Sequence, residues 1–149
     1  MNKRYISKST QETITYAADI AKAFKAGDII FLRGDLGAGK TTFVKGVAKA
    51  LKAKVSDVCS PTFIVMNYYK GELPIFHFDL YRLEKMDEIQ SLNLDEYFYG
   101  QGITLIEWPE RLGSLAPEPT GLIELQHINE QQRKICVSYP LKHRAKHLG

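Results

Sequence analysis

Hydrophobic residues recur at intervals of three and four along two segments of the chain, which is the spacing of one face of an α-helix. They are Ile14, Ala17, Ala18, Ala21 and Phe24 in the first segment, and Phe43, Val44, Val47, Ala48 and Leu51 in the second. The first segment follows Ser9-Thr10-Gln11-Glu12, which fits the S-x-x-E capping box of a helix start. We therefore predict a helix from this box to near Gly27, and a second helix directly after residue 39.

Short apolar runs elsewhere in the chain have the length and composition of β-strands. They cover residues 28–32, 62–66, 75–78, 103–106, 122–126 and 134–138. Residues 28–32 are almost continuously apolar, which is typical of a strand buried on both faces of a parallel sheet. The Gly- and Pro-containing segment 70–74 predicts an antiparallel hairpin between the second and third runs. These patterns predict an α/β fold with a mixed sheet, to which residues 85–99 add one or two short helices.

Composition places the chain among ordinary globular proteins. With 149 residues, of which 44% are hydrophobic and 25% charged, it fits a single domain over residues 1–149 without a linker. Its apolar runs are far shorter than the roughly 18 residues that span a bilayer. The first residues have no secretion signal, so we expect a cytoplasmic protein with no membrane partner.

Charge and cysteine content argue against two further classes. The net charge of +3 is well short of that of a dedicated nucleic-acid binder, and we expect the basic tail after about Tyr139 to be peripheral. Cys59 and Cys136 stand far apart, with no C-x-x-C pair and no histidine at metal-ligand spacing. We expect buried thiols rather than a disulfide or a zinc site.

Residues 34–41 carry the clearest chemical signal. Gly34-Asp35-Leu36-Gly37-Ala38-Gly39-Lys40-Thr41 matches G-x-x-x-x-G-K-[ST], the P-loop, and lies between a predicted strand and a predicted helix as that motif requires. Its glycines let backbone N–H groups point at a phosphate, and the helix N-terminus adds positive charge. Lys40 would reach the β- and γ-phosphates, and the Thr41 hydroxyl would coordinate a bridging Mg²⁺. The motif predicts a nucleoside triphosphate with magnesium.

Magnesium at a P-loop needs an acidic partner, normally at the end of a neighbouring strand. Glu107 follows the run 103–106, and Asp79 follows the run 75–78. We prefer Glu107 as the metal ligand, because a histidine makes the run before Asp79 less apolar. Asp79 would then lie near the γ-phosphate and position the attacking water or accept its proton. Either acid could instead be an exposed residue at a strand end.

Four further residues each have a functional and a packing interpretation. Thr62, in Ser60-Pro61-Thr62, could sense magnesium or the γ-phosphate, or belong to an ordinary turn. Arg133 could contact phosphate or lie on the surface, and Trp108 could stack on a partner or pack. A lone histidine in an apolar run is more often a hydrogen-bonded core residue than a ligand, and we interpret His77 in this way.

Four blocks, in their order and spacing, resemble one family. They are Gly34–Phe43, Ser60–Phe63, His77–Leu83 and Glu107–Glu110, within a resemblance that spans about residues 9–138. In all four the chain is similar to the bacterial TsaE proteins, the ATPase component of tRNA threonylcarbamoyladenosine synthesis. The Asn-Lys-x-Asp and Asp-x-x-Gly motifs of small GTPases do not occur where expected, which also favours ATP over GTP.

The resemblance implies a single P-loop NTPase domain, whose mixed, mainly parallel central sheet is flanked by helices and carries antiparallel additions. It implies a Mg²⁺-dependent ATPase that is weak alone and acts with TsaB and TsaD. TsaD would transfer the threonylcarbamoyl group to adenosine 37 of tRNAs that read codons beginning with A, and tRNA would be contacted through the complex. ATP hydrolysis by this chain would support repeated turnover without performing the transfer.

The resemblance also implies roles for individual residues. Those that it puts around the nucleotide are Thr10, Leu36, Gly37, Ala38, Gly39, Lys40, Thr41, Thr42, Asp79, Glu110 and Arg133. Thr41 and Glu107 would hold Mg²⁺, and Lys40, Asp79 and Glu107 would carry the hydrolysis.

Two other functions fit a P-loop chain of this length. A P-loop small-molecule kinase would need an acceptor pocket and usually an arginine-bearing lid, yet Arg82 is the only arginine between Tyr69 and Gly102. A non-hydrolysing, nucleotide-gated interaction module would bind ATP and present an ordered loop to a partner. Steady-state phosphate release distinguishes this module from an ATPase.

Overall fold

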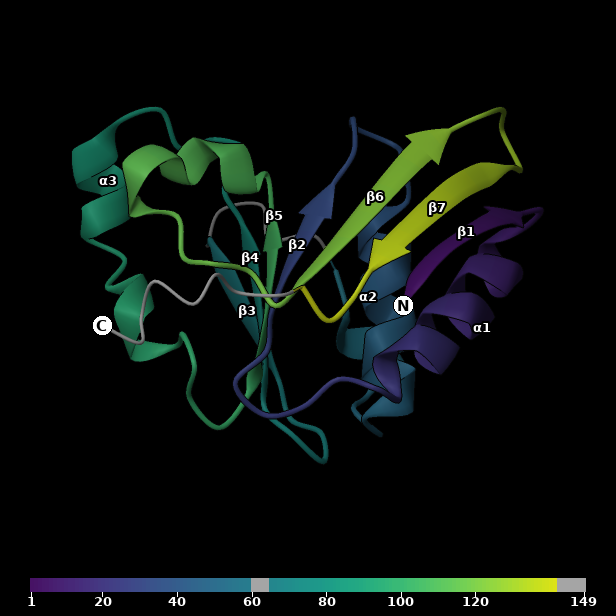
Figure 1. Ribbon diagram of the computed structural model, residues 1–149, viewed down its shortest axis with the longest axis horizontal. Coiled ribbons are helices and arrows are strands. Elements are labelled where there is room, and N and C mark those ends of the chain that lie inside the picture. The colour runs from purple at the N-terminus through teal and green to yellow at the C-terminus, as the bar shows by residue number, and fades with distance from the viewer. Residues whose placement is uncertain (60–64, 142–149) are drawn as a thin grey trace.

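A computed structural model describes residues 1–59 and 65–141, and Figure 1 shows a twisted sheet with helices packed against it. The strands are β1 (Asn2–Ser7), β2 (Ile29–Arg33), β3 (Met66–Tyr69), β4 (Ile75–Asp79), β5 (Ile103–Glu107), β6 (Gly121–His127) and β7 (Arg133–Ser138). The α-helices are α1 (Thr10–Ala21), α2 (Lys40–Ala50) and α3 (Met86–Gln90), and the 3₁₀ helices are η1 (Val55–Asp57), η2 (Leu94–Glu96) and η3 (Pro109–Leu115). Within the described ranges, none of the helices has the length and apolar character needed to cross a bilayer.

The strands form one mixed sheet in the order β1-β7-β6-β2-β5-β4-β3. At its centre, β2 pairs in parallel with β5 and with β6, and β5 pairs in parallel with β4. Antiparallel pairs complete both edges, β3 with β4 on one side and β7 with β6 and β1 on the other. The predicted α/β fold, with a parallel centre and antiparallel additions, is confirmed.

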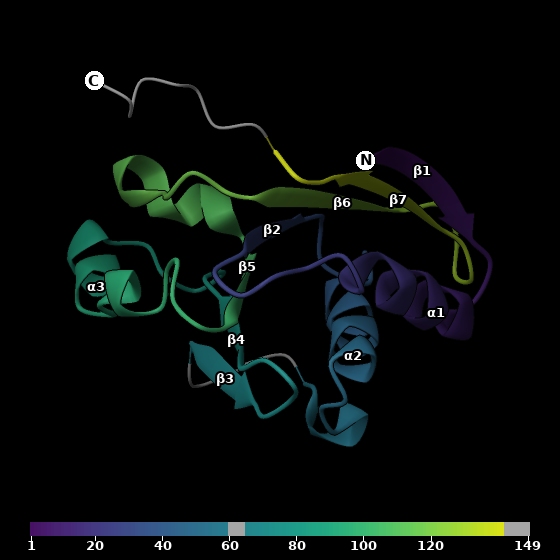
Figure 2. The ribbon, with the colours of Figure 1, turned by 60° about the horizontal axis from the view of Figure 1, so that its bottom comes forward.

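Both faces of the central sheet are covered. Figure 2 shows α1 and α2 on one side of β2 and β5, and α3 on the other. Ile30 and Leu32 of β2 belong to the hydrophobic cluster that contains α1 and α2, whereas Ile29 and Phe31 pack in the cluster that contains α3. These four side chains are at most 6% exposed. Burial on both faces explains why the run is apolar without alternation.

The first helix begins as predicted but ends earlier. The Ser9 side chain accepts a hydrogen bond from the backbone N–H of Glu12 at 3.0 Å, which caps α1. The helix ends at Ala21 rather than near Gly27. The N–H of Phe24 donates a hydrogen bond to the Ala21 carbonyl, three residues back. This spacing is that of a 3₁₀ turn, so the α-helical pattern has ended there. Phe24 is still buried in the core, and the helical spacing of apolar residues therefore continues past the helix.

A close crossing of α1 and α2 fixes the position of the P-loop. A Cβ at Gly46 of α2 would lie 2.4 Å from the Ala17 Cβ and 2.5 Å from the Ile14 carbonyl oxygen of α1. A glycine is needed there because any side chain would push the two helices apart. The N-terminus of α2, and the loop before it, are thereby held at the end of β2.

One strand is missing from the sequence prediction, and another is only partly described by the structure. The sequence does not predict β1, because this edge strand is mostly exposed and shows little apolar alternation. The hairpin is confirmed, but its first described strand, β3, begins at Met66. Most of the predicted strand 62–66 and the block Ser60-Pro61-Thr62 lie outside the described residues, as does the tail from residue 142.

The expectation of two buried cysteines is wrong. Cys59 is exposed and Cys136 is half-buried. Along β7, Ile135 and Val137 are turned into the core, which leaves Cys136 on the opposite face of the strand. Cys59 lies in the connection after η1.

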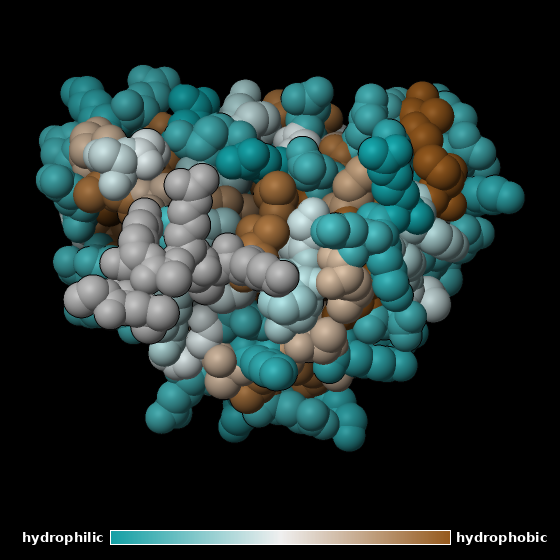
Figure 3. All heavy atoms as spheres, in the orientation of Figure 1, coloured by the Kyte–Doolittle hydropathy of each residue, from teal (hydrophilic) through white to brown (hydrophobic). Residues whose placement is uncertain are grey.

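Exposed hydrophobic side chains are scattered over the surface. The face visible in Figure 3 is mostly hydrophilic, and its hydrophobic areas are separated from one another. Leu36 of the P-loop is among the exposed ones, with 67% of its surface accessible. Isolated apolar side chains of this kind are usual on globular proteins.

Candidate functional site

The loop between β2 and α2 is shaped by its glycines. Gly39, the residue before α2, has a φ of 101°, a left-handed conformation that residues with a Cβ rarely adopt. A Cβ at Gly34 would lie 2.5 Å from the carbonyl oxygen of Leu125 in β6. The loop therefore bends sharply and passes close to β6. The free N–H groups of the first turn of α2 are left available to an anion.

The loop forms one side of a cavity of about 310 Å³. Its lining residues are Leu36, Gly37, Gly39, Lys40, Thr41, Thr42, Asp79, Glu107, Trp108 and Arg133. The fold thus brings the P-loop together with both candidate acids and with Arg133, which are far apart in the sequence. A larger cavity, of about 590 Å³, lies beside α1 and contains none of these residues. We take the smaller cavity as the site because the groups with phosphate and metal chemistry converge there.

Three residues expected near the nucleotide do not line this cavity. Ala38 is buried within the loop. Glu110 lies in η3, close enough to Lys40 to affect its pKa. Thr10 is the exposed first residue of α1. Their contacts with a nucleotide stay predictions.

Lys40 is a buried cation, only 5% exposed. Its Nζ donates a hydrogen bond to the Gly34 carbonyl and lies 4.0 Å from the centre of the Trp108 ring. Burial lowers the pKa of the Lys40 ammonium, because the charged form is poorly solvated there. Nearby carboxylates oppose this shift, in decreasing order Glu107, Asp79, Glu110 and Asp35. The nearby carboxylates offset the effect of burial on Lys40 only in part, and a bound phosphate group would add the negative charge that this cation lacks.

The two candidate acids lie side by side. Asp79 ends β4 and Glu107 ends β5, and they are direct partners in the parallel register. Glu107 is 3% exposed, so it is not an exposed acid at a strand end. Asp79 is half-buried, and its carboxylate accepts a hydrogen bond from the backbone N–H of Tyr81 at 3.0 Å. Both lie at the edge of the sheet that the P-loop occupies, as the carboxyl ends of parallel strands must.

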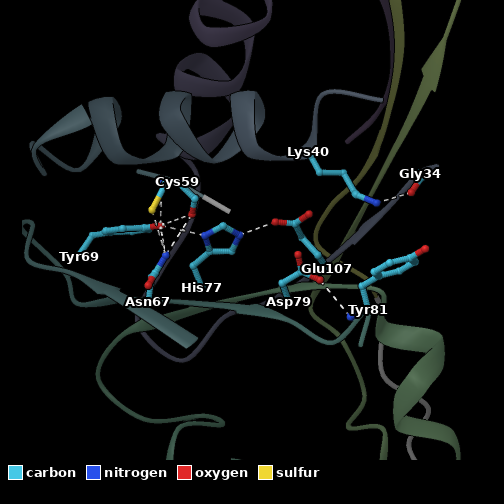
Figure 4. Close-up of polar contacts among 9 residues, drawn as sticks. All are labelled: Gly34, Lys40, Cys59, Asn67, Tyr69, His77, Asp79, Tyr81 and Glu107. Carbon is cyan, nitrogen blue, oxygen red and sulfur yellow. Dashed lines mark hydrogen bonds and ion pairs between the residues drawn. The ribbon is translucent and has the colours of Figure 1, made fainter. Parts of the chain in front are cut away.

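His77 lies directly behind Glu107 (Figure 4). It is fully buried, and its Nε2 is 2.5 Å from a carboxylate oxygen of Glu107. Its Nδ1 is 3.0 Å from the hydroxyl of Tyr69. The interpretation of His77 as a hydrogen-bonded core residue is confirmed, but its partner, Glu107, is not predicted by the sequence. This pairing depends on the register of β4 with β5, which puts His77, Asp79 and Glu107 on one face of the sheet and which no local pattern contains.

Trp108 and Arg133 complete the cavity. Trp108 has a φ of 60°, which is uncommon for a residue with a side chain. Its ring covers Lys40 and packs on Tyr81, with 4.9 Å between ring centroids. Arg133 enters from β7, and its guanidinium donates to the Gln132 carbonyl at 2.9 Å. Both large side chains line the cavity beside the P-loop.

The donor atoms in the cavity suit a magnesium ion. The Thr41 hydroxyl and the carboxylates of Asp79 and Glu107 are hard oxygen ligands, which Mg²⁺ prefers. In the part of the chain that the structure describes, no group of three or more His, Cys, Asp or Glu could hold a metal ion unaided. An ion here would therefore draw on phosphate oxygens and water, as Mg²⁺ usually does at nucleotide sites.

Comparison with known proteins gives a consistent result. The family model described as "Threonylcarbamoyl adenosine biosynthesis protein TsaE" matches residues 7–135. The "tRNA threonylcarbamoyladenosine biosynthesis protein TsaE" of Treponema pallidum is 36% identical over 135 residues, which cover 91% of this chain and 99% of that protein. The protein of the same name from Bacillus subtilis is 44% identical over 126 residues, 84% of this chain and 78% of that one.

A solved structure agrees with these sequence relatives. The crystal structure of Bacillus subtilis YdiB superposes with a TM-score of 0.76 and 32% sequence identity. The superposition covers 95% of this chain and 87% of that chain. The similarity therefore extends over nearly the whole chain.

Proposed function

We propose that this chain, which belongs to the TsaE family, binds ATP with Mg²⁺ in the cavity at the P-loop and hydrolyses it to support threonylcarbamoylation of tRNA. The observation that carries the proposal is the convergence of the P-loop, Lys40 and the paired carboxylates of Asp79 and Glu107 on one cavity. The family's place in threonylcarbamoyladenosine synthesis supplies the biological setting.

The P-loop side accounts for nucleotide binding. Backbone N–H groups of residues 36–41 and the N-terminus of α2 attract the phosphates without a protein charge for each oxygen. Lys40 exchanges its bond to the Gly34 carbonyl for the β- and γ-phosphate oxygens. Thr42 and Arg133 line the same cavity and are expected to contact the nucleotide. Trp108 shields Lys40 from water and strengthens its interaction with the phosphates.

The carboxylate side accounts for the reaction. Asp79 positions a water molecule in line with the γ-phosphate and accepts its proton. The water oxygen bonds to the γ-phosphorus as the bond to the oxygen shared with ADP breaks, so that ADP and inorganic phosphate leave. Thr41 and Glu107 would hold Mg²⁺, which neutralises charge on the phosphate oxygens.

The partners in this proposal come from the family. TsaD performs the transfer to adenosine 37 and acts together with TsaB, while this chain contributes ATP hydrolysis and contacts tRNA through the complex. We expect its own ATPase activity to be weak and the assembly to work in the cytoplasm, where tRNA is modified. The mild net charge of +3 agrees with a component that does not read tRNA by itself.

Phosphate release tests the proposal. The purified chain is assayed with Mg²⁺ and ATP, alone and with TsaB, TsaD and tRNA, and we expect slow release alone and more with the partners. Binding of ATP with no phosphate release in either mixture would favour the non-hydrolysing module. Phosphate transfer from ATP to a small acceptor would favour the kinase.

A further inference from the structure

A chain of buried polar groups runs through an otherwise apolar part of the core. From the cavity inward it consists of Glu107 on β5, His77 on β4 and Tyr69 on β3. The distances between successive polar atoms are 2.5 and 3.0 Å. Figure 4 shows the chain as a line of side chains that leads away from Lys40.

We infer that His77 is a positioning residue for Glu107, which it holds by a hydrogen bond while Tyr69 holds His77 from behind. The inference rests on the proposed function, because it concerns how Glu107 is presented to Mg²⁺. His77 does not line the cavity, so it acts only through Glu107.

The hydrogen bonds define the orientation of the imidazole. A carboxylate can only accept hydrogen bonds, so the proton between His77 and Glu107 is on Nε2. Burial raises the pKa of the Tyr69 hydroxyl, which therefore keeps its proton. Both ring nitrogens of His77 have partners, and rotation of the ring would break both contacts.

Packing alone does not explain a histidine at this position. Ile75, Ile103 and Leu105 lie on the same face of the two strands and are fully buried apolar residues. Replacing a buried polar pair by apolar residues of similar size is often neutral or stabilising, because desolvation offsets the attraction within the pair. The polar chain is better explained by what it does for Glu107. It fixes one carboxylate oxygen and leaves the other for a ligand, as outer hydrogen-bond partners do at metal sites.

The test measures how much Mg²⁺ tightens nucleotide binding, which needs no turnover. Calorimetry with the non-hydrolysable analogue AMP-PNP gives the dissociation constant in Mg²⁺ and in EDTA for the wild type, His77→Ala and His77→Gln. We expect His77→Ala to reduce the gain from Mg²⁺ by about tenfold, the lower end of the usual loss for an outer partner of a metal ligand. The Gln side-chain amide reaches the position of Nε2 and donates in its place, so His77→Gln should stay within about threefold of the wild type. Affinity in EDTA should not change, because the P-loop is intact.

Tyr69→Phe gives a second and milder variant. It removes only the hydroxyl that holds His77, and we expect a loss of about threefold in the gain from Mg²⁺, the size of a single neutral hydrogen bond. Tyr68→Phe is the matched control, because Tyr68 is the neighbouring tyrosine, is 52% exposed and is absent from the polar chain. Thermal melting of each variant checks that it is folded. If His77→Ala does not fold, the result for Tyr69→Phe decides whether the polar chain positions Glu107.

Distinct outcomes separate this inference from the function on which it rests. A wild-type chain that binds AMP-PNP no more tightly with Mg²⁺ than with EDTA overturns both. A wild type that gains from Mg²⁺, together with folded His77→Ala and Tyr69→Phe variants that gain equally, overturns the positioning role alone. Equal losses in His77→Ala and His77→Gln also overturn it, because the donor at Nε2 would then be irrelevant.

Discussion

The two walls of the cavity are built in different ways. The P-loop wall comes from one continuous segment, residues 36–42, which offers backbone N–H groups and Lys40. The carboxylate wall consists of Asp79 and Glu107, which meet only because β4 and β5 pair in register. Local conformation sets the first wall, whereas long-range strand pairing and buried hydrogen bonds set the second.

In the proposed function, this difference separates nucleotide binding from hydrolysis. The P-loop wall is positive and attracts phosphates directly. The carboxylate wall is negative, so it repels free ATP and becomes useful only through a cation or a water molecule. Substitutions in the P-loop wall should therefore weaken binding with and without Mg²⁺, whereas substitutions in the carboxylate wall should affect only the Mg²⁺-dependent steps.

The largest effect is expected from Lys40→Ala in the P-loop wall. Loss of the cation removes charge stabilisation at the β- and γ-phosphates, and we expect ATP hydrolysis to fall by about 10³-fold. Calorimetry should also show weaker binding of ATP in both Mg²⁺ and EDTA. Lys49→Ala, on the exposed side of the same helix, is the control and should leave both unchanged. Normal hydrolysis by Lys40→Ala would remove the P-loop from the mechanism.

Glu107→Gln tests the metal-binding half of the carboxylate wall. The amide keeps an acceptor for His77 but loses the negative charge, so we expect Mg²⁺-dependent hydrolysis to fall by about 10²-fold. Binding of ATP in EDTA should be unchanged or slightly tighter, because a charge that repels the phosphates is gone. A Mg²⁺ titration of phosphate release, with binding measured in parallel, checks both. Equal losses with and without Mg²⁺ would mean that Glu107 does not hold the ion.

Asp79→Asn tests the other half of that wall. Its amide oxygen can still accept from the Tyr81 N–H, so the backbone should stay in place. We expect kcat to fall roughly tenfold to a hundredfold, at or below the lower end of what a positioned base contributes, with ATP affinity within about twofold. Tight binding with normal turnover would exclude a role for Asp79 in the reaction.

Trp108→Ala is expected to have the smallest effect. Loss of the ring exposes the Lys40 ammonium to water, which weakens its attraction to the phosphates, so we expect KM for ATP to rise about fivefold and kcat to change little. Trp108→Phe keeps an aromatic ring there and should lie between this variant and the wild type. Because Trp108 is the chain's single tryptophan, its fluorescence in the wild type should also change on ATP binding. A wild-type emission that ATP leaves unaltered would place the ring away from the nucleotide.

The P-loop wall could be predicted from the sequence because its residues are contiguous. Four fixed positions between a continuous apolar run and a helical pattern define the loop, and the structure has the same order of strand, loop and helix. The sequence also predicts that both acids lie at one end of the sheet, since each follows an apolar run and parallel strands end on the same side. The proposed partners, TsaB and TsaD, cannot be predicted from residue chemistry and rest on the family resemblance.

The rest depends on contacts between distant residues. The bond between His77 and Glu107 needs the register of β4 and β5, which no local pattern contains. β1 is an exposed edge strand, whose pairing with β7 is set by backbone hydrogen bonds rather than by apolar alternation. The predicted end of α1 lies beyond the observed one. The reason is that Phe24, in the turn after the helix, is buried and continues the helical spacing of apolar residues.

The most direct test of the central claim is a reconstituted tRNA modification with TsaB, TsaD and this chain. The measurement is the number of tRNA molecules modified per complex, with wild-type chain and with Lys40→Ala. If ATP hydrolysis in this cavity supports repeated turnover, the wild type should drive many rounds and Lys40→Ala should stop at about one. Equal numbers of rounds with the two chains would contradict the account.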